Sequence, residues 1–105
     1  IMNRNDYENI LYERYEDGIA AGVKQGIERG IKQGIEDLMG KIPGLLEIKV
    51  ETVGLTSSNA DVMLYSVFED EASLKGYAVH PEHVAVADGK VRPFTKTRLC
   101  LDFEV

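Results

Sequence analysis

The sequence predicts an α+β fold in which a four-stranded antiparallel sheet carries its helices on one face. Apolar and polar residues alternate over residues 46–51 and again over residues 98–105, which is the period of a half-buried strand. Residues 62–68 carry apolar side chains on both faces, and a glycine repeat with helical spacing occupies residues 18–35. With a first strand and a second helix added, the order is βαββαβ, that of a ferredoxin-like domain.

The composition excludes several classes of function. The length of 105 residues is that of one domain, and the net charge of −6 argues against a nucleic-acid-binding surface. The longest apolar segments are far too short to span a membrane, and the first ten residues lack the apolar centre of a signal peptide. Cys100 is the only cysteine, so no disulfide can form within the chain, and we expect this thiol to be a small core residue. These features predict a cytoplasmic protein without nucleic-acid or membrane partners.

The first strand competes with the start of a helix in the same segment. In YENILYERYEDG, residues 7–18, the residues Ile10, Leu11, Tyr12 and Tyr15 suit a short strand with β-favouring side chains. The same residues could equally begin the helix that follows. We predict the strand here.

The next segment is a helix built on a repeat. Glycine recurs every four residues from Gly18 to Gly34, each followed by isoleucine or valine, so the apolar stripe drifts by about 40° per repeat. Each glycine costs roughly 1 kcal/mol relative to alanine, so this helix needs a surface to pack on. That surface is the sheet, or alternatively a second chain that approaches closely along the glycines. The repeat could belong to the domain or be a fused or replaced element.

The remaining strands follow in clear order. After the Pro43-Gly44 turn, an alternating strand places its apolar residues on one face; they are Leu46, Ile48 and Val50. In the next strand, one face carries Val62, Leu64 and Phe68 and the other carries Met63, Tyr65 and Val67. The last strand alternates Leu99, Leu101, Phe103 and Val105 with polar residues. Because the helices cover only one face of the sheet, we expect a homodimer in which two sheets pack face to face.

A helix over residues 70–79, with Asp70 near its N-terminus, leads into the most specific motif, YAVHPEH. Pro81 ends a helix and suits the first position of a new one, so His80 would cap or pack and His83 would lie on the next turn. His80, Glu82 and His83 also have the spacing of metal ligands, but a zinc site needs three or four converging ligands and the sequence supplies no further cluster. We therefore expect no metal and no cofactor.

Residues 42–105 resemble the stress-responsive A/B barrel (Dabb) family. The resemblance rests on IPGLLEIKV, on DVMLYSVFEDEASLKGYAVHPEHV and on RLCLDFEV, and the Tyr-x-x-His-Pro-x-His order is its most specific part. The first 35 residues are atypical, because the family's first strand carries a His-Ile-Val-like segment that is missing here. The resemblance implies a dimeric α+β barrel of unassigned biochemistry. We expect this protein to bind a small apolar or aromatic molecule.

A plant branch of that family acts as polyketide cyclases, and its cavity residues match Tyr77 and His83. By that resemblance, His83 would be the general base of an intramolecular aldol closure and Tyr77 would donate a hydrogen bond to the enolate oxygen. We name His80, Tyr65 and Phe68 as candidate ligand contacts. The same scaffold would also suit a monooxygenase-like enzyme, and the sequence is compatible with a purely structural, oligomerising protein as well.

Overall fold

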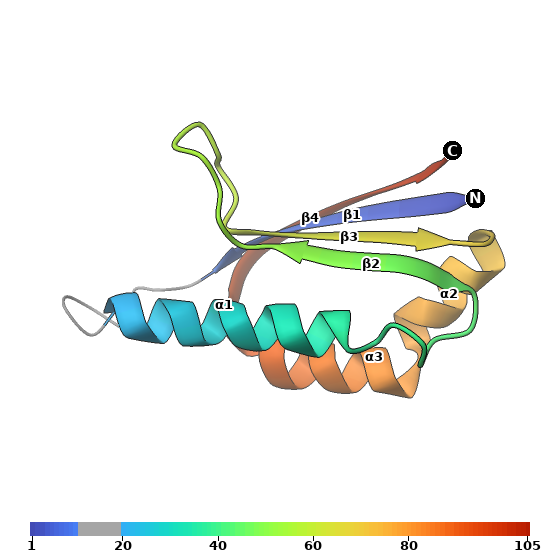
Figure 1. Cartoon of the computed structure of the whole chain (residues 1–105), viewed down its shortest axis with the longest axis horizontal. Coiled ribbons are helices and arrows are strands. Elements are labelled where there is room, and N and C mark those ends of the chain that lie inside the picture. Colours follow the sequence, from blue (N-terminus) through green and yellow to red (C-terminus); the bar gives the residue numbers. More distant parts are fainter. Residues whose placement is uncertain (11–19) are drawn as a thin grey trace.

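The computed structural model describes residues 1–10 and 20–105 as a sheet with one layer of helices (Figure 1). The strands are β1 (Met2–Ile10), β2 (Leu45–Glu51), β3 (Val62–Phe68) and β4 (Thr95–Glu104). The helices are α1 (Ala20–Glu36), α2 (Glu71–Val79) and α3 (Pro81–Val86). A π-helical segment, Ala87–Val91, and a 3₁₀ turn, Arg92–Phe94, connect α3 to β4. No helix in the described part of the chain has the length and hydropathy of a membrane-spanning segment.

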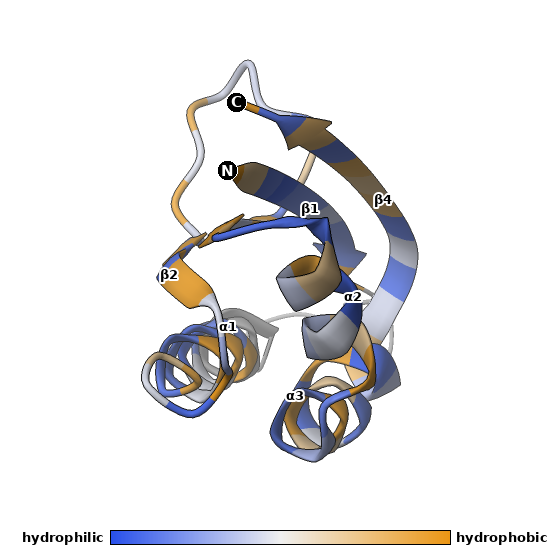
Figure 2. Cartoon of the chain, turned by 90° about the vertical axis from the view of Figure 1, so that its right-hand side faces the viewer, coloured by the Kyte–Doolittle hydropathy of each residue, from blue (hydrophilic) through white to orange (hydrophobic). Residues whose placement is uncertain are grey.

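The four strands form one antiparallel sheet in the order β2-β3-β1-β4. This order and the chain path confirm the predicted ferredoxin-like fold. Figure 2 shows all three helices on the same side of the sheet, while the opposite side is uncovered. We call the covered side the inner face and the uncovered side the open face.

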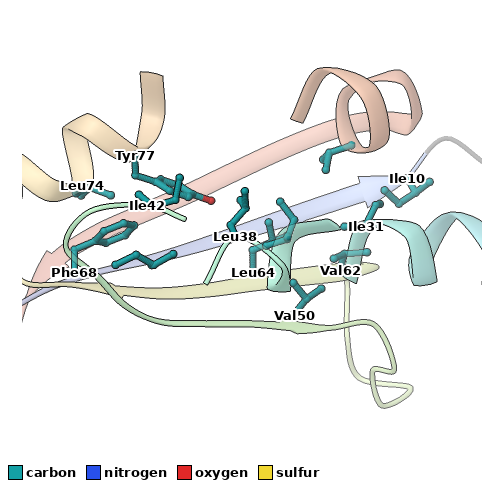
Figure 3. Packing of buried hydrophobic residues seen from close by; sticks show 13 residues of the cluster. Ile10, Ile31, Leu38, Ile42, Val50, Val62, Leu64, Phe68, Leu74 and Tyr77 are labelled. Carbon is teal, nitrogen blue, oxygen red and sulfur yellow. The ribbon is translucent and has the colours of Figure 1, made fainter. Parts of the chain in front are cut away.

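The hydrophobic core lies between the inner face and the helices. Buried apolar side chains from β2, β3 and α1 meet those of α2 there, and Figure 3 shows Phe68 beside Tyr77. The centroids of these two rings are 5.0 Å apart. Both rings are almost fully buried, with exposed fractions of 0% and 2%. Aromatic pairs in this geometry stabilise a core beyond the area that they bury.

The first strand begins earlier than the sequence pattern indicated. β1 spans Met2–Ile10, whereas we predicted a short strand within residues 7–18. Ile10 lies in β1, and residues 11–19, including Leu11, Tyr12 and Tyr15, lie outside the described residues. β1 consists mostly of asparagine and charged residues, which are poor strand formers. It forms a strand because β3 and β4 pair with it on both sides.

α1 confirms the helix predicted from the glycine repeat, and it lies against the edge strand β2 (Figure 1). Lys32 Nζ donates to the carbonyl of Val50 at 2.8 Å, and the Val50 N–H donates to Glu36 Oε2 at 3.2 Å. At Gly34 the helix approaches α3 and the π-helical segment closely, since an added Cβ would lie 2.9 Å from Lys90 Cδ. Of the three repeat glycines whose surroundings are described, Gly26, Gly30 and Gly34, only Gly34 lies this close to a neighbouring helix.

Two side chains that the sequence placed in the core, Leu46 and Cys100, are exposed in the structure. The pairing of β2 with β3 shifts between Leu45 and Glu47, so Leu45 is buried and Leu46 is exposed. Such a shift moves a side chain to the other face of a sheet. Cys100 is exposed rather than in the core, because this part of β4 extends beyond the cover of the helices.

The open face carries apolar side chains from β3 and β4 on either side of an asparagine-rich β1. The strand registers place on it Asn3, Asn5, Tyr7, Met63, Tyr65, Val67, Leu99, Leu101 and Phe103. Leu99 and Leu101 are 67% and 59% exposed on this face. The predicted two-sided character of residues 62–68 is confirmed, because their odd-numbered side chains are half-buried here and their even-numbered ones are buried inside.

Candidate functional site

A cavity of about 50 Å³ lies between the inner face of the sheet and the helices. The polar side chains that line it from β1 and β4 are Asp6, Glu8, Thr95 and Arg98. Those that line it from the helical side are Tyr77, His83 and Arg92. Its apolar wall consists of Ile35, Leu64, Ala87 and Val91. Charged groups and apolar surface therefore meet around one small, partly open space.

The break between α2 and α3 places Tyr77 and His83 together at this cavity. His80 caps α3, with its Nδ1 accepting the Glu82 N–H at 3.1 Å, and Pro81 is the first residue of that helix, as predicted. The turn brings the ring of His83 to within 4.1 Å, centroid to centroid, of the ring of Tyr77. The helix break is thus the structural reason why these two rings, one on each helix, share one site.

The environment changes the acid–base properties of both rings. Burial, followed by the nearby charge of Asp6, raises the pKa of the Tyr77 phenol well above its usual value. Burial also lowers the pKa of His83, so its imidazole is neutral near pH 7. The Nδ1 atom of His83 is buried and makes no hydrogen bond. A neutral imidazole with an unpaired nitrogen is a suitable proton acceptor.

Two buried carboxylates of β1 form the opposite wall. Asp6 and Glu8 are 4% and 2% exposed, and Arg98 of β4 bridges them. Arg98 Nη2 lies 2.8 Å from Asp6 Oδ1, and its Nε lies 3.3 Å from Glu8 Oε1. Burial raises the pKa of both carboxyls; Arg98 opposes the rise at each, and the Thr95 hydroxyl also opposes it at Glu8. The second oxygen of Glu8, Oε2, is buried and makes no hydrogen bond.

The structure brings together only part of the predicted site. Tyr77 and His83 lie together in the cavity lining, as the motif predicted. Phe68 lies behind Tyr77 in the core and does not line the cavity. His80 is occupied as a helix cap, and Tyr65 lies on the open face, across the sheet from the cavity. These three residues are therefore separated from the space in which a ligand could meet His83.

Sequence reasoning missed the carboxylates and their arginine. The signal was present in NRNDYEN, where Arg4, Asp6 and Glu8 alternate with uncharged residues and so share one face of a strand. The register places Glu8 opposite Arg98 and Arg4 opposite Asp102. Arg4 binds Asp102 through two contacts, Nε–Oδ1 at 2.5 Å and Nη2–Oδ2 at 2.8 Å. Complementary charges on the two strands thus join β1 to β4 along the inner face.

Other possible sites are poorer in functional groups. Across residues 1–10 and 20–105, no group of three histidine, cysteine or acidic side chains is arranged to hold a metal ion. Two wide grooves of about 260 Å³ and 320 Å³ flank Tyr7 on the open face. They are larger than the cavity, but the ionisable side chains that line them, Tyr7, Glu51 and Asp61, are not buried. The cavity remains the best candidate because several side chains with shifted pKa values gather around it.

Comparison with known proteins agrees with this architecture. A dimeric protein of unknown function with a ferredoxin-like fold from Bacteroides fragilis is 26% identical, with a TM-score of 0.84, and the match covers 99% of this chain and 95% of that one. A Dabb family protein from Mesorhizobium loti is 14% identical, with a TM-score of 0.72 and coverage of 99% and 95%. A cofactor-independent oxygenase from Streptomyces nogalater is 10% identical, with a TM-score of 0.70 and coverage of 99% and 91%. The last two likenesses show the fold alone.

The family assignment rests on a longer part of the chain than residues 42–105. No curated protein matches the sequence. The family described as "Stress responsive A/B Barrel Domain" matches residues 13–105, which includes the whole of α1. The chain therefore belongs to the stress-responsive A/B barrel (Dabb) family.

Proposed function

We propose that this protein binds a small molecule in the cavity between β1, β4 and the helices. The observation that carries the proposal is that two residues of the cavity lining, Glu8 and His83, each have a buried polar atom without a hydrogen-bond partner; these atoms are Glu8 Oε2 and His83 Nδ1. Buried polar atoms normally have hydrogen-bond partners, and leaving one unpaired costs free energy. Ligand-binding sites are a common place for such groups, because the ligand supplies the missing partner.

The size of the cavity limits the part of a ligand that it can hold. A volume of about 50 Å³ accepts a group of a few atoms, whereas a cavity that binds benzene is about 150 Å³. The polar end of a ligand would therefore occupy the cavity, and an aromatic ring would enter only if the neighbouring wall of α3 moved.

The working form in this proposal is a homodimer that joins two open faces. The apolar side chains of β3 and β4 on that face need cover, and the Bacteroides fragilis relative is described as dimeric. Such a dimer would cover the grooves beside Tyr7 and leave the cavity on the helical side free.

A second candidate function is catalysis of proton transfer next to a carbonyl, as in a polyketide-type cyclase. It is favoured by the contact of a neutral imidazole with a phenol in the same cavity. His83 would accept the proton through Nδ1, and the Tyr77 hydroxyl would donate to the oxygen on which negative charge develops. This function requires both residues, whereas binding alone does not.

Thermal melting against a panel of small aromatic and polyketide-like molecules tests the binding proposal. A ligand at about 100 times its dissociation constant should stabilise the protein by roughly 2.7 kcal/mol. We expect a raised midpoint for the wild type and a much smaller shift for His83→Ala, because that change removes a cavity group.

His80→Ala is the matched control, since it removes the only other histidine from a position outside the cavity. Its melting point should fall through the loss of the cap, but its ligand-induced shift should remain. Equal shifts in the wild type and His83→Ala would place the ligand elsewhere. Turnover of a bound compound that disappears in both His83→Ala and Tyr77→Phe would favour the enzyme.

A further inference from the structure

The charges that line the cavity are not balanced, and this selects the kind of ligand that it can take. We propose that the buried end of the ligand is a hydrogen-bond donor of the amidine or amine type, and that carboxylates and phosphates are rejected. This inference rests on the proposed binding function and adds the chemical class of the ligand.

The first support is the free oxygen of Glu8. Its side chain is only 2% exposed, and Arg98 engages Oε1 alone. Oε2 lies in a residue that lines the cavity and has no hydrogen-bond partner. A carboxylate oxygen in this position accepts hydrogen bonds, and it is most strongly satisfied by a charged N–H donor.

The second support is that the nearby cations are already neutralised. Arg98 is shared between the two carboxylates of β1, so one positive charge faces two buried acids. Arg92 is paired with Asp88, and Arg4 is held by both oxygens of Asp102. Each of these arginines already contacts at least one carboxyl group, so none of them is left over to attract an anion, and four carboxyl groups face three arginines.

The third support comes from the facing wall. His83 Nδ1 is a second buried atom without a partner, and the imidazole is neutral because burial disfavours its charged form. A planar donor with two N–H groups could bond to both Glu8 Oε2 and His83 Nδ1. The volume of about 50 Å³ suits a head group of a few heavy atoms.

Three probes of the same planar shape and different charge test this selectivity: acetamidinium, acetamide and acetate. Each is titrated into the isotope-labelled protein while NMR follows the His83 ring and the backbone amide of Glu8. We expect acetamidinium to bind most tightly, acetamide more weakly and acetate not at all. Glu8→Gln should weaken acetamidinium binding by about tenfold or more, because a charge-assisted hydrogen bond is lost.

Glu47→Gln is the matched control, since it removes an exposed strand carboxylate of the same type that lies outside the cavity lining. The Glu47→Gln protein should bind acetamidinium with the same affinity as the wild type. Two results would overturn donor selectivity while still showing that the cavity binds ligands. The first is that acetate shifts the NMR signals of the cavity as strongly as acetamidinium does. The second is that Glu8→Gln keeps the full affinity for acetamidinium. Absence of cavity shifts with all three probes would also overturn it, and the melting panel would then decide independently whether larger molecules bind.

Discussion

Replacing Arg98 with methionine should lower the free energy of unfolding by about 3 kcal/mol near pH 7. Arg98 contacts both Asp6 and Glu8, whose side chains are 6% and 2% exposed. Its removal leaves two buried carboxylates without an opposite charge. Urea denaturation at several pH values measures the loss.

The loss of stability in Arg98→Met should depend on pH in a defined direction. Burial already raises both carboxyl pKa values above their ordinary values of 3.8 and 4.5, so the folded state binds protons more tightly than the unfolded chain. Stability from these groups is therefore greatest below about pH 4 and falls as the pH rises through the folded-state pKa values. Removal of Arg98 raises the folded-state pKa values of both carboxyls further. The difference in the free energy of unfolding between variant and wild type should therefore be small in acid and grow toward neutral pH.

Arg92→Met is the control for this experiment. Arg92 also lines the cavity, but its partner is the exposed Asp88 one helical turn away, and such a pair contributes less than about 1 kcal/mol. Combining Arg98→Met with Glu8→Gln should restore part of the lost stability. A pH-independent loss for Arg98→Met would show that its side chain acts by packing rather than by charge.

The second large effect is expected at the centre of the core. Phe68→Ala should cost about 4 kcal/mol, because Phe68 is fully buried and its ring packs against that of Tyr77. The vacated space would also let Tyr77 move away from His83 and weaken any ligand held there. Chemical denaturation gives the stability, and the same melting panel gives the binding.

Leu55→Ala is the matched surface change. Leu55 is 80% exposed, so its loss should alter stability by less than about 0.5 kcal/mol. If Phe68→Ala cost no more than this surface change, the packing of Phe68 against Tyr77 would not be a main support of the helical layer.

The order of the elements could be predicted because most of them carry a strong local pattern. Alternation over residues 98–105 and the Asp70 and Pro81 boundaries correspond to β4, α2 and α3. β1 could not be found in the same way. Its residues favour turns, and it becomes a strand through pairing with β3 and β4, contacts that no local window contains.

The same limit applies to the candidate site, because only the part that depends on local sequence could be predicted. Tyr77 and His83 lie close in sequence across a visible helix break, so their proximity follows from local geometry. Glu8 and Arg98 are distant in sequence and meet only when β1 and β4 are correctly registered. With β1 misplaced, this half of the cavity could not be assembled from the pattern of residues.

A crystal structure of the dimer with the panel compound that stabilises it most would test the cavity directly. We predict that the compound's polar end lies between β1 and α3, in contact with Glu8 Oε2 and His83 Nδ1. A compound bound instead in the grooves beside Tyr7, with the cavity unchanged, would contradict the assignment of the binding site to the helical side of the sheet.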